Sequence, residues 1–241
     1  MTGGTSGIGT ALVLAFLEAG AQVSTCGRND ARLNDLVAHH PGLHGMLADL
    51  AEPDAPDRVV TAAVAALGGL DIVVNNAAVQ EHSAFVPISD TALVETARHE
   101  VAVNLVAPIA ITAAALPHFE RNGPAAVVMI TSGLAFAPKR SAPVYCATKA
   151  GLHTFTKALR YQAEDAGTGL LVCEAILPLV DTPMTQGREG PTEKLTAPDV
   201  AARIVEGLRR DRTELRIGKT RLLIALLRVS RRKAERLLRN S

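Results

Sequence analysis

The sequence opens on a glycine-rich stretch, Met1-Thr-Gly-Gly-Thr-Ser-Gly-Ile-Gly9, followed directly by an amphipathic pattern over residues 11–19 that stops at Gly20. Glycines leave backbone amides free to approach a ligand, and the start of a helix adds the positive end of its dipole. Together these groups suit a pyrophosphate. Residues 21–26 then predict a strand, so the stretch is typical of the first unit of a dinucleotide-binding fold.

The remaining chain repeats the alternation of strands and helices. The run Leu70-Asp-Ile-Val-Val-Asn-Asn-Ala-Ala78 is apolar on both faces before it reaches polar residues, as expected for a buried parallel strand. We therefore expect a single α/β domain over residues 1–241, with a Rossmann-type, doubly wound parallel sheet flanked by helices. The expected helices cover residues 31–40, 56–67, 90–116, 141–166 and 198–208, and the expected strands end near residues 50, 78, 131 and 177, with an edge strand over 214–219.

The composition narrows the class of protein. With 48% hydrophobic and 20% charged residues, the chain reads as a soluble protein, and its 3% of aromatic residues argue against a base-stacking nucleic-acid surface. The scattered cysteines, Cys26, Cys146 and Cys173, predict reduced thiols and a cytoplasmic location. No leader opens the chain, and the apolar run over 222–227 is too short to span a membrane.

The C-terminal residues 216–241 form a basic tail on an acidic body. The tail holds nine Lys or Arg and one acid, Glu235, so residues 1–215 carry a net charge of about −7. Its leucines recur at helical spacing and predict one or two amphipathic helices. We expect them to pack on their own domain or on a second subunit, and binding to an anionic membrane, nucleic acid or acidic substrate is the alternative.

The residue that selects the cofactor in a dinucleotide-binding fold stands at the end of the second strand. A carboxylate there binds the free hydroxyls of NAD, whereas an arginine pairs with the 2′-phosphate of NADP. Here the sequence is Gly27-Arg28-Asn29, without an acid. We therefore expect NADP(H) in preference to NAD(H), with Arg28 as its main determinant; a solvated loop charge is the alternative. Asp49 is expected to accept a hydrogen bond from the adenine amino group, to cap the next helix, or both.

A proton-carrying pair is predicted within Ser141-Ala-Pro-Val-Tyr145-Cys-Ala-Thr-Lys149-Ala-Gly151. On a helix, Tyr145 and Lys149 are four residues apart and share one face. An ammonium beside a phenol favours the phenolate and lowers the tyrosine pKa from about 10 toward working pH. Taken alone, such a pair also arises by chance.

Two other polar residues and a loop complete the pattern. Asn104 lies in the middle of the apolar helix over 90–116, where its amide needs a partner of structural or functional kind. Ser132 follows a buried strand. The polar, glycine-containing loop over 183–197 predicts a mobile substrate lid, and together with residues 134–140 it would set specificity.

In combination, these motifs resemble the ordered set of the short-chain dehydrogenase/reductase family. The resemblance covers residues 1–200, and the separation of 13 between Ser132 and Tyr145 is usual for that family. The stretches Cys26-Gly-Arg-Asn29, Pro41-Gly-Leu-His44 and Ser132-Gly-Leu-Ala-Phe136 are similar to its DltE-like branch. The motif set consists of Thr2-Gly-Gly-Thr-Ser-Gly7-Ile-Gly9, Asn75-Asn-Ala-Ala78, Asn104, Ser132 and Tyr145-Cys-Ala-Thr-Lys149.

The resemblance implies a role for each matching residue. Tyr145 would exchange a proton with the substrate oxygen while hydride moves to or from the nicotinamide, and Ser132 would hold that oxygen. Lys149 would lower the tyrosine pKa and bind the nicotinamide ribose, and Asn104 would hold a water on the proton path. The expected cofactor-binding residues are Gly3, Thr5, Ser6, Gly7, Ile8, Gly9, Arg28, Asp49, Leu50, Asn76, Ala77, Tyr145, Lys149, Val180 and Thr182.

The chain departs from the family pattern in three places. Only Met1 and Thr2 precede the glycine turn, so the first strand is largely missing from the numbered chain. An open edge in the middle of a sheet leaves backbone groups unpaired, so we expect a start upstream of Met1; a tolerated gap is the alternative. In addition, Ala78 replaces the usual glycine of its motif, and Leu177-Pro178 replaces the usual Pro-Gly.

The sequence thus predicts an NADP(H)-dependent ketoreductase acting on a small carbonyl or secondary alcohol substrate. The alternative is a catalytically silent NADP(H)-binding regulatory or scaffold protein, suggested by the missing strand and the basic tail. We expect a cytoplasmic homo-oligomer, a dimer or tetramer, with no nucleic-acid partner and no transmembrane segment. No metal is expected, because the seven histidines lack ligand-like spacing.

Overall fold

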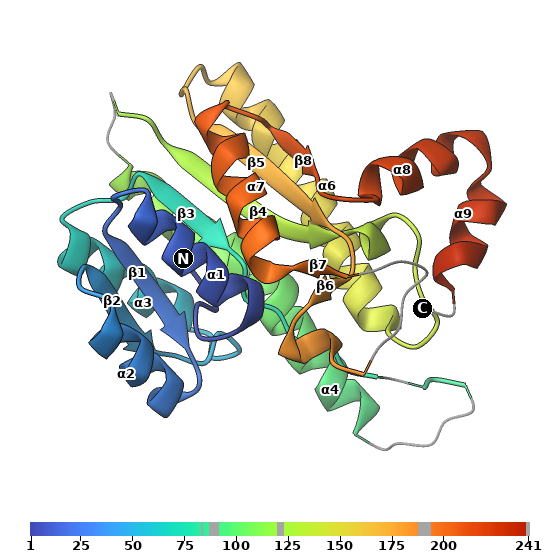
Figure 1. The fold of residues 1–241 in the computed structure, drawn as a ribbon, viewed down its shortest axis with the longest axis horizontal. Helices are drawn as coiled ribbons and strands as arrows, with labels where there is room; N and C mark the ends of the chain where they lie inside the picture. Colours follow the sequence, from blue (N-terminus) through green and yellow to red (C-terminus); the bar gives the residue numbers. More distant parts are fainter. Residues whose placement is uncertain (83, 87–91, 120–122, 188–193, 240–241) are drawn as a thin grey trace.

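A parallel sheet lies between layers of helices in the computed structural model, which describes residues 1–82, 84–86, 92–119, 123–187 and 194–239 (Figure 1). β1 pairs with β2, and β3, β4, β5 and β8 form a second hydrogen-bonded group in that order. All of these pairs are parallel, which confirms the predicted α/β fold. The strands are β1 (Val23–Gly27), β2 (Leu43–Leu47), β3 (Ile72–Asn75), β4 (Ala126–Ser132), β5 (Leu171–Leu177) and β8 (Glu214–Arg216).

The first residues of the chain join the two groups of strands. Thr2 forms an isolated parallel bridge with Cys26 of β1, and its backbone N–H donates to the carbonyl of Val74 in β3 at 2.9 Å. Gly3 N donates to the carbonyl of Cys26 at 3.0 Å. The alternative of an open gap is therefore wrong for Thr2 and Gly3, which lie between β1 and β3. At the other end of β3, its first residue, Ile72, is 39% exposed.

Helices cover both faces of the sheet. On one face, α1 (Gly7–Glu18) and α7 (Ala197–Arg209) pack with the inward side chains of β3, β4 and β5. On the other face lie α3 (Ala55–Leu67), α5 (Ala107–Ala115) and α6 (Pro143–Asp165). Val127 and Val128 of β4 are fully buried and point to opposite faces, so the central strands separate two apolar clusters. α2 (Asp30–His39) lies beside the edge strand β2.

The helix expected over residues 90–116 forms from Leu93 onward but is irregular. Asp90 lies outside the described residues, and the segment divides into α4 (Leu93–Val101), a π-helical turn (Ala102–Val106), α5 and a 3-10 turn (Leu116–His118). Asn104 sits in the π-helical turn with its side chain fully buried. A π-helical turn shifts the register of a helix and re-aims one side chain, which is why a simple apolar pattern did not predict it.

Leu93–His118 is also the one helical run in the described residues that is long and apolar enough to cross a membrane, judged by length and composition alone. Within this fold, α5 packs on α3 and β3, and α4 packs on α6. The run therefore packs on the sheet and on neighbouring helices along one side, while Val94, Val101, Val106 and Leu116 are exposed.

Several predicted boundaries shift; β3 ends at Asn75 and the edge strand β8 at Arg216. The strand expected to end at Leu50 ends at Leu47, so Asp49 stands in the following loop. The expected lid contains a 3-10 turn (Pro183–Thr185) and the strand β7 (Leu195–Thr196), which pairs with β6 (Val180–Asp181). Its residues 188–193 lie outside the described part of the chain, and its predicted mobility stays a prediction.

The basic tail forms two helices, α8 (Thr220–Val229) and α9 (Arg231–Leu238), as its leucine spacing predicted. They pack on each other and on the 3-10 turn that follows β4, Gly133–Ala135 (Figure 1). The tail thus packs on its own chain through its apolar side chains, and the described Lys and Arg side chains of α8 and α9 are exposed.

Candidate active site

A cleft of about 970 Å³ lies at the carboxyl ends of the strands. This edge of a parallel sheet is where open α/β folds bind ligands, because the strand ends and the starts of the helices converge there. All fifteen residues expected to bind the cofactor line the cleft, and so does Ser132. Asn104 is not among the lining residues and lies behind the wall.

The glycine turn has the conformation that its sequence predicts. Gly3 and Gly7 adopt positive φ angles of 68° and 53°, which disfavour a side chain. At Gly9 a Cβ would stand 1.8 Å from the carbonyl oxygen of Gly3, so only glycine allows the turn to close against α1. Ser6 is the N-cap of α1, and the residues of the first turn line the cleft, so this helix N-terminus is a place where an anion can bind.

The turn is fastened to the end of β3 by Thr2 and Asn76. The Thr2 hydroxyl accepts hydrogen bonds from the backbone N–H of Asn76 at 3.1 Å and of Ala77 at 3.0 Å. The Asn76 amide donates to the carbonyls of Thr2 at 3.0 Å and Gly3 at 3.2 Å. These bonds span more than seventy residues of sequence and fix the phosphate-sized loop against the sheet.

Arg28 lies at the far end of the cleft, past β1. Its guanidinium is half exposed, with Nη1 3.8 Å from Asp49 Oδ2 and 3.4 Å from His99 Nε2. Asp49 accepts a hydrogen bond from the backbone N–H of Ala51 at 3.0 Å. It does not cap the next helix, because α3 begins at Ala55 with Asp54 as its N-cap, so that part of the prediction is wrong.

Tyr145 and Lys149 share the first turns of α6, as predicted. Both side chains are buried and line the cleft, and the Lys149 ammonium lies 5.7 Å from the centre of the Tyr145 ring. Lys149 Nζ also donates to the carbonyl oxygen of Ile130 at 2.8 Å, which holds the ammonium at the end of β4. Burial lowers the pKa of Lys149 from its ordinary 10.5 to about 8.

Ser132 is the last residue of β4 and the N-cap of the following 3-10 turn. Its hydroxyl accepts a hydrogen bond from the backbone N–H of Leu134 at 3.2 Å, which fixes the side chain at the cleft. A hydroxyl can still donate its own proton. The chain thus brings Ser132, Tyr145 and Lys149 to one wall of the cleft.

Asn104 has backbone partners. Its Nδ2 donates to the carbonyl of Val79 at 2.8 Å, and its Oδ1 accepts from the N–H of Val79 at 2.8 Å. A third contact joins Nδ2 to Thr148 Oγ1 at 3.4 Å. The predicted need of its amide for a partner is therefore met structurally, by the segment that follows β3, and Asn104 connects that segment to α6.

Val180 and Thr182 stand on the opposite wall. Val180 is buried in β6, and Thr182 forms a capping box with Thr185 around the short turn between them. A Cβ on Gly7 would meet the Thr182 side chain at 3.1 Å. This segment therefore closes directly over the glycine turn.

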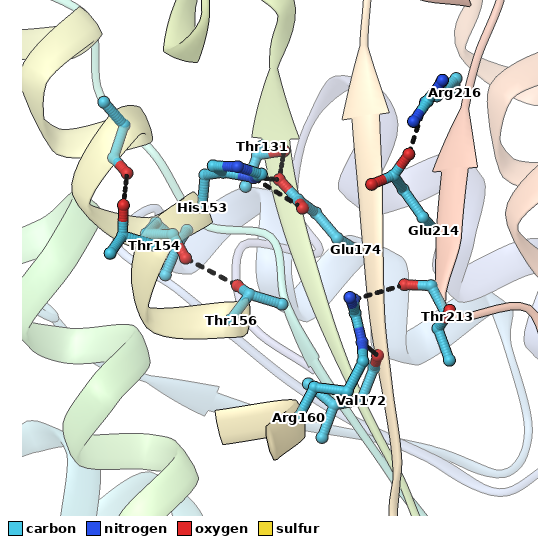
Figure 2. A network of polar contacts seen from close by, with 12 residues as sticks. Thr131, His153, Thr154, Thr156, Arg160, Val172, Glu174, Thr213, Glu214 and Arg216 are labelled. Carbon is cyan, nitrogen blue, oxygen red and sulfur yellow. Dashed lines mark hydrogen bonds and ion pairs between the residues drawn. The ribbon is translucent and has the colours of Figure 1, made fainter. Parts of the chain in front are cut away.

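A buried charged network beneath the site escaped prediction. Glu174 in the middle of β5 is fully buried, and its carboxylate contacts His153 Nδ1 at 2.9 Å and accepts from the Thr131 hydroxyl at 2.6 Å. Figure 2 shows His153 reaching it from α6 and Thr131 from β4. His153 is one turn beyond Lys149, so the network ties the helix that carries the site to the sheet. The signal in the sequence that could have indicated this network was a single Glu in an otherwise apolar strand.

Further lining residues that sequence reasoning did not assign come from the tail and from the segments around Ser132. They are Ile130, Thr131, Lys219, Thr220, Leu222, Leu223, Leu226 and Leu238, whereas Leu134 and Lys139 belong to the segment 134–140 that was expected to set specificity. The spacing of the leucines predicted the helices of the tail, but it did not predict that these leucines would line the cleft.

Metal ligation and thiol chemistry find little support in the geometry. Within the described ranges, no group of three or more His, Cys, Asp or Glu side chains could hold a metal ion. The three cysteines are free and buried. Burial raises the pKa of each thiol, to about 12 for Cys173, which makes a reactive thiolate unfavourable.

The fold and the cleft define a dinucleotide-binding α/β protein of the Rossmann type. A family model described as short chain dehydrogenase matches residues 1–192. The uncharacterized oxidoreductase DltE of Bacillus subtilis is 34% identical over 219 residues, which cover 89% of this chain and 85% of that protein. The chain therefore belongs to the short-chain dehydrogenase/reductase family and is an oxidoreductase of its DltE-like branch.

Solved structures agree with this fold. A short-chain dehydrogenase/reductase from Burkholderia phymatum in complex with NAD matches 95% of this chain and 93% of its own, with a TM-score of 0.81 at 19% identity. A short-chain dehydrogenase from Burkholderia cenocepacia J2315 in complex with NADP matches 88% and 92%, with a TM-score of 0.76 at 25% identity.

Proposed function

We propose that the protein is an NADP(H)-dependent oxidoreductase that interconverts a carbonyl and a secondary alcohol. The observation that carries the proposal is the meeting of Ser132, Tyr145 and Lys149 on one wall of a cleft whose other end is built from the glycine turn. The bound nicotinamide would supply or accept a hydride at the substrate carbon. The remaining chemistry belongs to the side chains of this chain.

In the reducing direction, the Tyr145 hydroxyl donates its proton to the substrate oxygen as that oxygen gains negative charge. Ser132 donates a hydrogen bond to the same oxygen and holds it in line. Lys149 lies beside the ring, and as an ammonium it favours the phenolate that remains. Lys149 would also bind the nicotinamide ribose. That Asn104 holds a water on the proton path stays a prediction, because its side-chain amide is bonded to the backbone of Val79. Oxidation reverses each step.

NADP(H) is the proposed cofactor because Arg28 stands where the adenosine ribose would lie. The guanidinium keeps part of its surface open to the cleft despite Asp49 and His99, so it can pair with a 2′-phosphate. Solved structures of similar fold in complex with NAD and with NADP support a nicotinamide cofactor, and the preference for NADP(H) rests on Arg28 alone. A cytoplasmic location and a homo-oligomeric state stay predictions of the sequence.

Removing the Tyr145 hydroxyl tests the mechanism. Tyr145→Phe should abolish oxidation of NADPH by a panel of ketones and aldehydes, followed at the nicotinamide absorbance, while NADPH binds nearly as tightly as before. Because a phenylalanine ring fills the same buried space, folding is expected to persist. Full turnover in this variant would remove Tyr145 from its role.

The alternative candidate is a catalytically silent NADP(H)-binding scaffold, for which the basic tail is the motivating observation. A wild-type protein that binds NADPH but reduces no carbonyl compound in the panel would favour it. The buried Tyr145 and Lys149 side chains argue against it, because burial of an ammonium is costly and a scaffold gains nothing from it.

A further inference from the structure

The cleft does not end at Ser132 and Tyr145 but continues to the two helices of the tail. Its wall there is formed by Leu222, Leu223 and Leu226 of α8 and by Leu238 of α9. Figure 1 shows these helices beyond the carboxyl edge of the sheet, past β8 and next to the turn that follows β4. An apolar compartment is therefore continuous with the candidate catalytic side chains.

This leucine wall, Leu222, Leu223, Leu226 and Leu238, is anchored to the site. The Thr220 hydroxyl contacts the carbonyls of Ile217 at 2.9 Å and Ile176 at 3.3 Å, which fixes the start of α8 at the end of β5. At the other end, the backbone N–H of Arg140 donates to the carbonyl of Arg239 at 3.1 Å. The wall is therefore held in place at both ends.

Gly133 allows this wall to pack close to the candidate catalytic residue Ser132. A Cβ at Gly133 would stand 3.0 Å from Leu223 Cδ2, tighter than ordinary contact. Glycine directly after Ser132 thus brings α8 next to the residue expected to hold the substrate oxygen. Leu223, Ala137 and Ala234 form a small buried cluster behind it, so the position of α8 does not depend on a ligand.

Part of the wall is still exposed to water. Leu222 is 68% exposed and Met184 on the facing segment is 37% exposed, although both line the cleft. Covering apolar surface of this kind is favourable at roughly 25 cal/mol per Å². A ligand with a hydrocarbon part would gain that free energy, whereas a polyhydroxylated one would leave its hydroxyls without partners.

We propose that the substrate is an apolar carbonyl compound whose hydrocarbon chain or ring lies against the leucine wall while its carbonyl oxygen lies at Ser132 and Tyr145. This inference rests on the proposed oxidoreductase function and names its substrate class. Lys219 and the buried Lys139 also line the cleft, but the four side chains of the wall itself are all leucines.

A homologous series of ketones tests the inference. With NADPH and linear 2-ketones from 2-butanone to 2-decanone, kcat/KM should rise about fourfold per methylene, the equivalent of about 0.8 kcal/mol, until the wall is covered. A ketopentose should be reduced at least a hundredfold less efficiently than the best ketone. A kcat/KM that is independent of chain length, or highest for the ketopentose, overturns the inference and leaves the oxidoreductase function standing.

Two exposed positions on α8 provide a matched pair of variants. Leu222→Gln makes the wall polar and should reduce the gain per methylene by at least half, while Val229→Gln should leave it unchanged. Val229 is 85% exposed and is not among the lining residues, so both substitutions are expected to fold. Equal chain-length dependence in Leu222→Gln and the wild type would overturn the inference.

Calorimetric titration of the same ketones into the complex with NADP⁺ separates the two proposals. Ketone affinity that increases with chain length, without reduction of any ketone by NADPH, supports the apolar site and overturns the proposed oxidation and reduction. Turnover without any gain in affinity along the series supports the proposed oxidation and reduction and overturns the apolar site.

Discussion

At the scale of single residues, the proposed preference for NADP(H) depends on Arg28. Its position after β1 was predicted from the sequence alone, because a strand end followed by Gly-Arg-Asn has one place in a dinucleotide-binding fold. Its neighbours were not predictable, since His99 is 71 residues away. Both His99 and Asp49 contact the guanidinium, and Asp49 would compete for it with the 2′-phosphate of the proposed NADP(H).

We predict that NADPH binds at least tenfold more tightly than NADH, and that Arg28→Ala removes most of this difference by weakening NADPH alone. The loss of a charge-assisted pair with phosphate accounts for an effect of this size. Titration followed by nucleotide fluorescence measures both affinities. Arg32→Ala, an exposed arginine on α2 outside the cleft, is the control and should bind like the wild type. Equal affinities of the wild type for NADPH and NADH would contradict the role of Arg28.

Lys149 makes stability depend on pH. Its folded pKa of about 8 lies below the ordinary 10.5, so between these values the unfolded chain binds more protons than the folded one. The free energy of unfolding therefore rises as the pH increases through this window, by up to about 3 kcal/mol, and this contribution is lost as the pH falls through 8.

Chemical denaturation of the ligand-free protein between pH 7.5 and 10 measures this dependence. Other titrating groups are common to the wild type and Lys149→Met, so the difference between the two proteins isolates the lysine. We expect the wild type to gain stability relative to Lys149→Met as the pH rises. Parallel curves would show that Lys149 is not buried as described.

At the scale of secondary-structure elements, α6 has to hold Tyr145 and Lys149 in a fixed position relative to β4 and β5. The sequence predicted the helix and its shared face, because spacing of four residues requires only local geometry. It did not predict the Glu174 and His153 pair, which depends on how two distant elements pack. Asn104 illustrates the same limit. The sequence showed that its amide needs a hydrogen-bond partner but could not predict that this partner is the backbone of Val79.

We predict that His153→Leu destabilises the protein by about 3 kcal/mol, because it leaves the buried Glu174 carboxylate with the Thr131 hydroxyl as its remaining described partner. The double variant His153→Leu/Glu174→Leu should recover at least part of this loss. Thr154→Ala, on the outward side of the same helix (Figure 2), should change stability by less than about 0.5 kcal/mol.

Urea denaturation of the four proteins gives these free energies. A double variant that is less stable than His153→Leu alone would contradict the account of Glu174 as a charge in need of compensation.

At the scale of the whole molecule, the architecture explains which predictions succeeded. Alternating strands and helices with a glycine turn specify a doubly wound sheet, so the carboxyl edge and most of the cleft residues followed from the order of motifs. Met1–Gly3 bridging β1 and β3 could not be predicted, because three residues carry no periodicity. The arrangement of α8 and α9 over the cleft was equally hidden, since an amphipathic pattern does not identify its partner surface.

The central claim is that this cleft transfers a hydride between a nicotinamide and a carbonyl carbon. Its most direct test is to reduce 2-octanone with NADPH that carries deuterium at the transferred position of C4 and to analyse the product by mass spectrometry. We predict 2-octanol with one deuterium on the carbinol carbon, formed by the wild type and not by Tyr145→Phe. Unlabelled alcohol, or labelled alcohol formed equally by both proteins, would contradict the account.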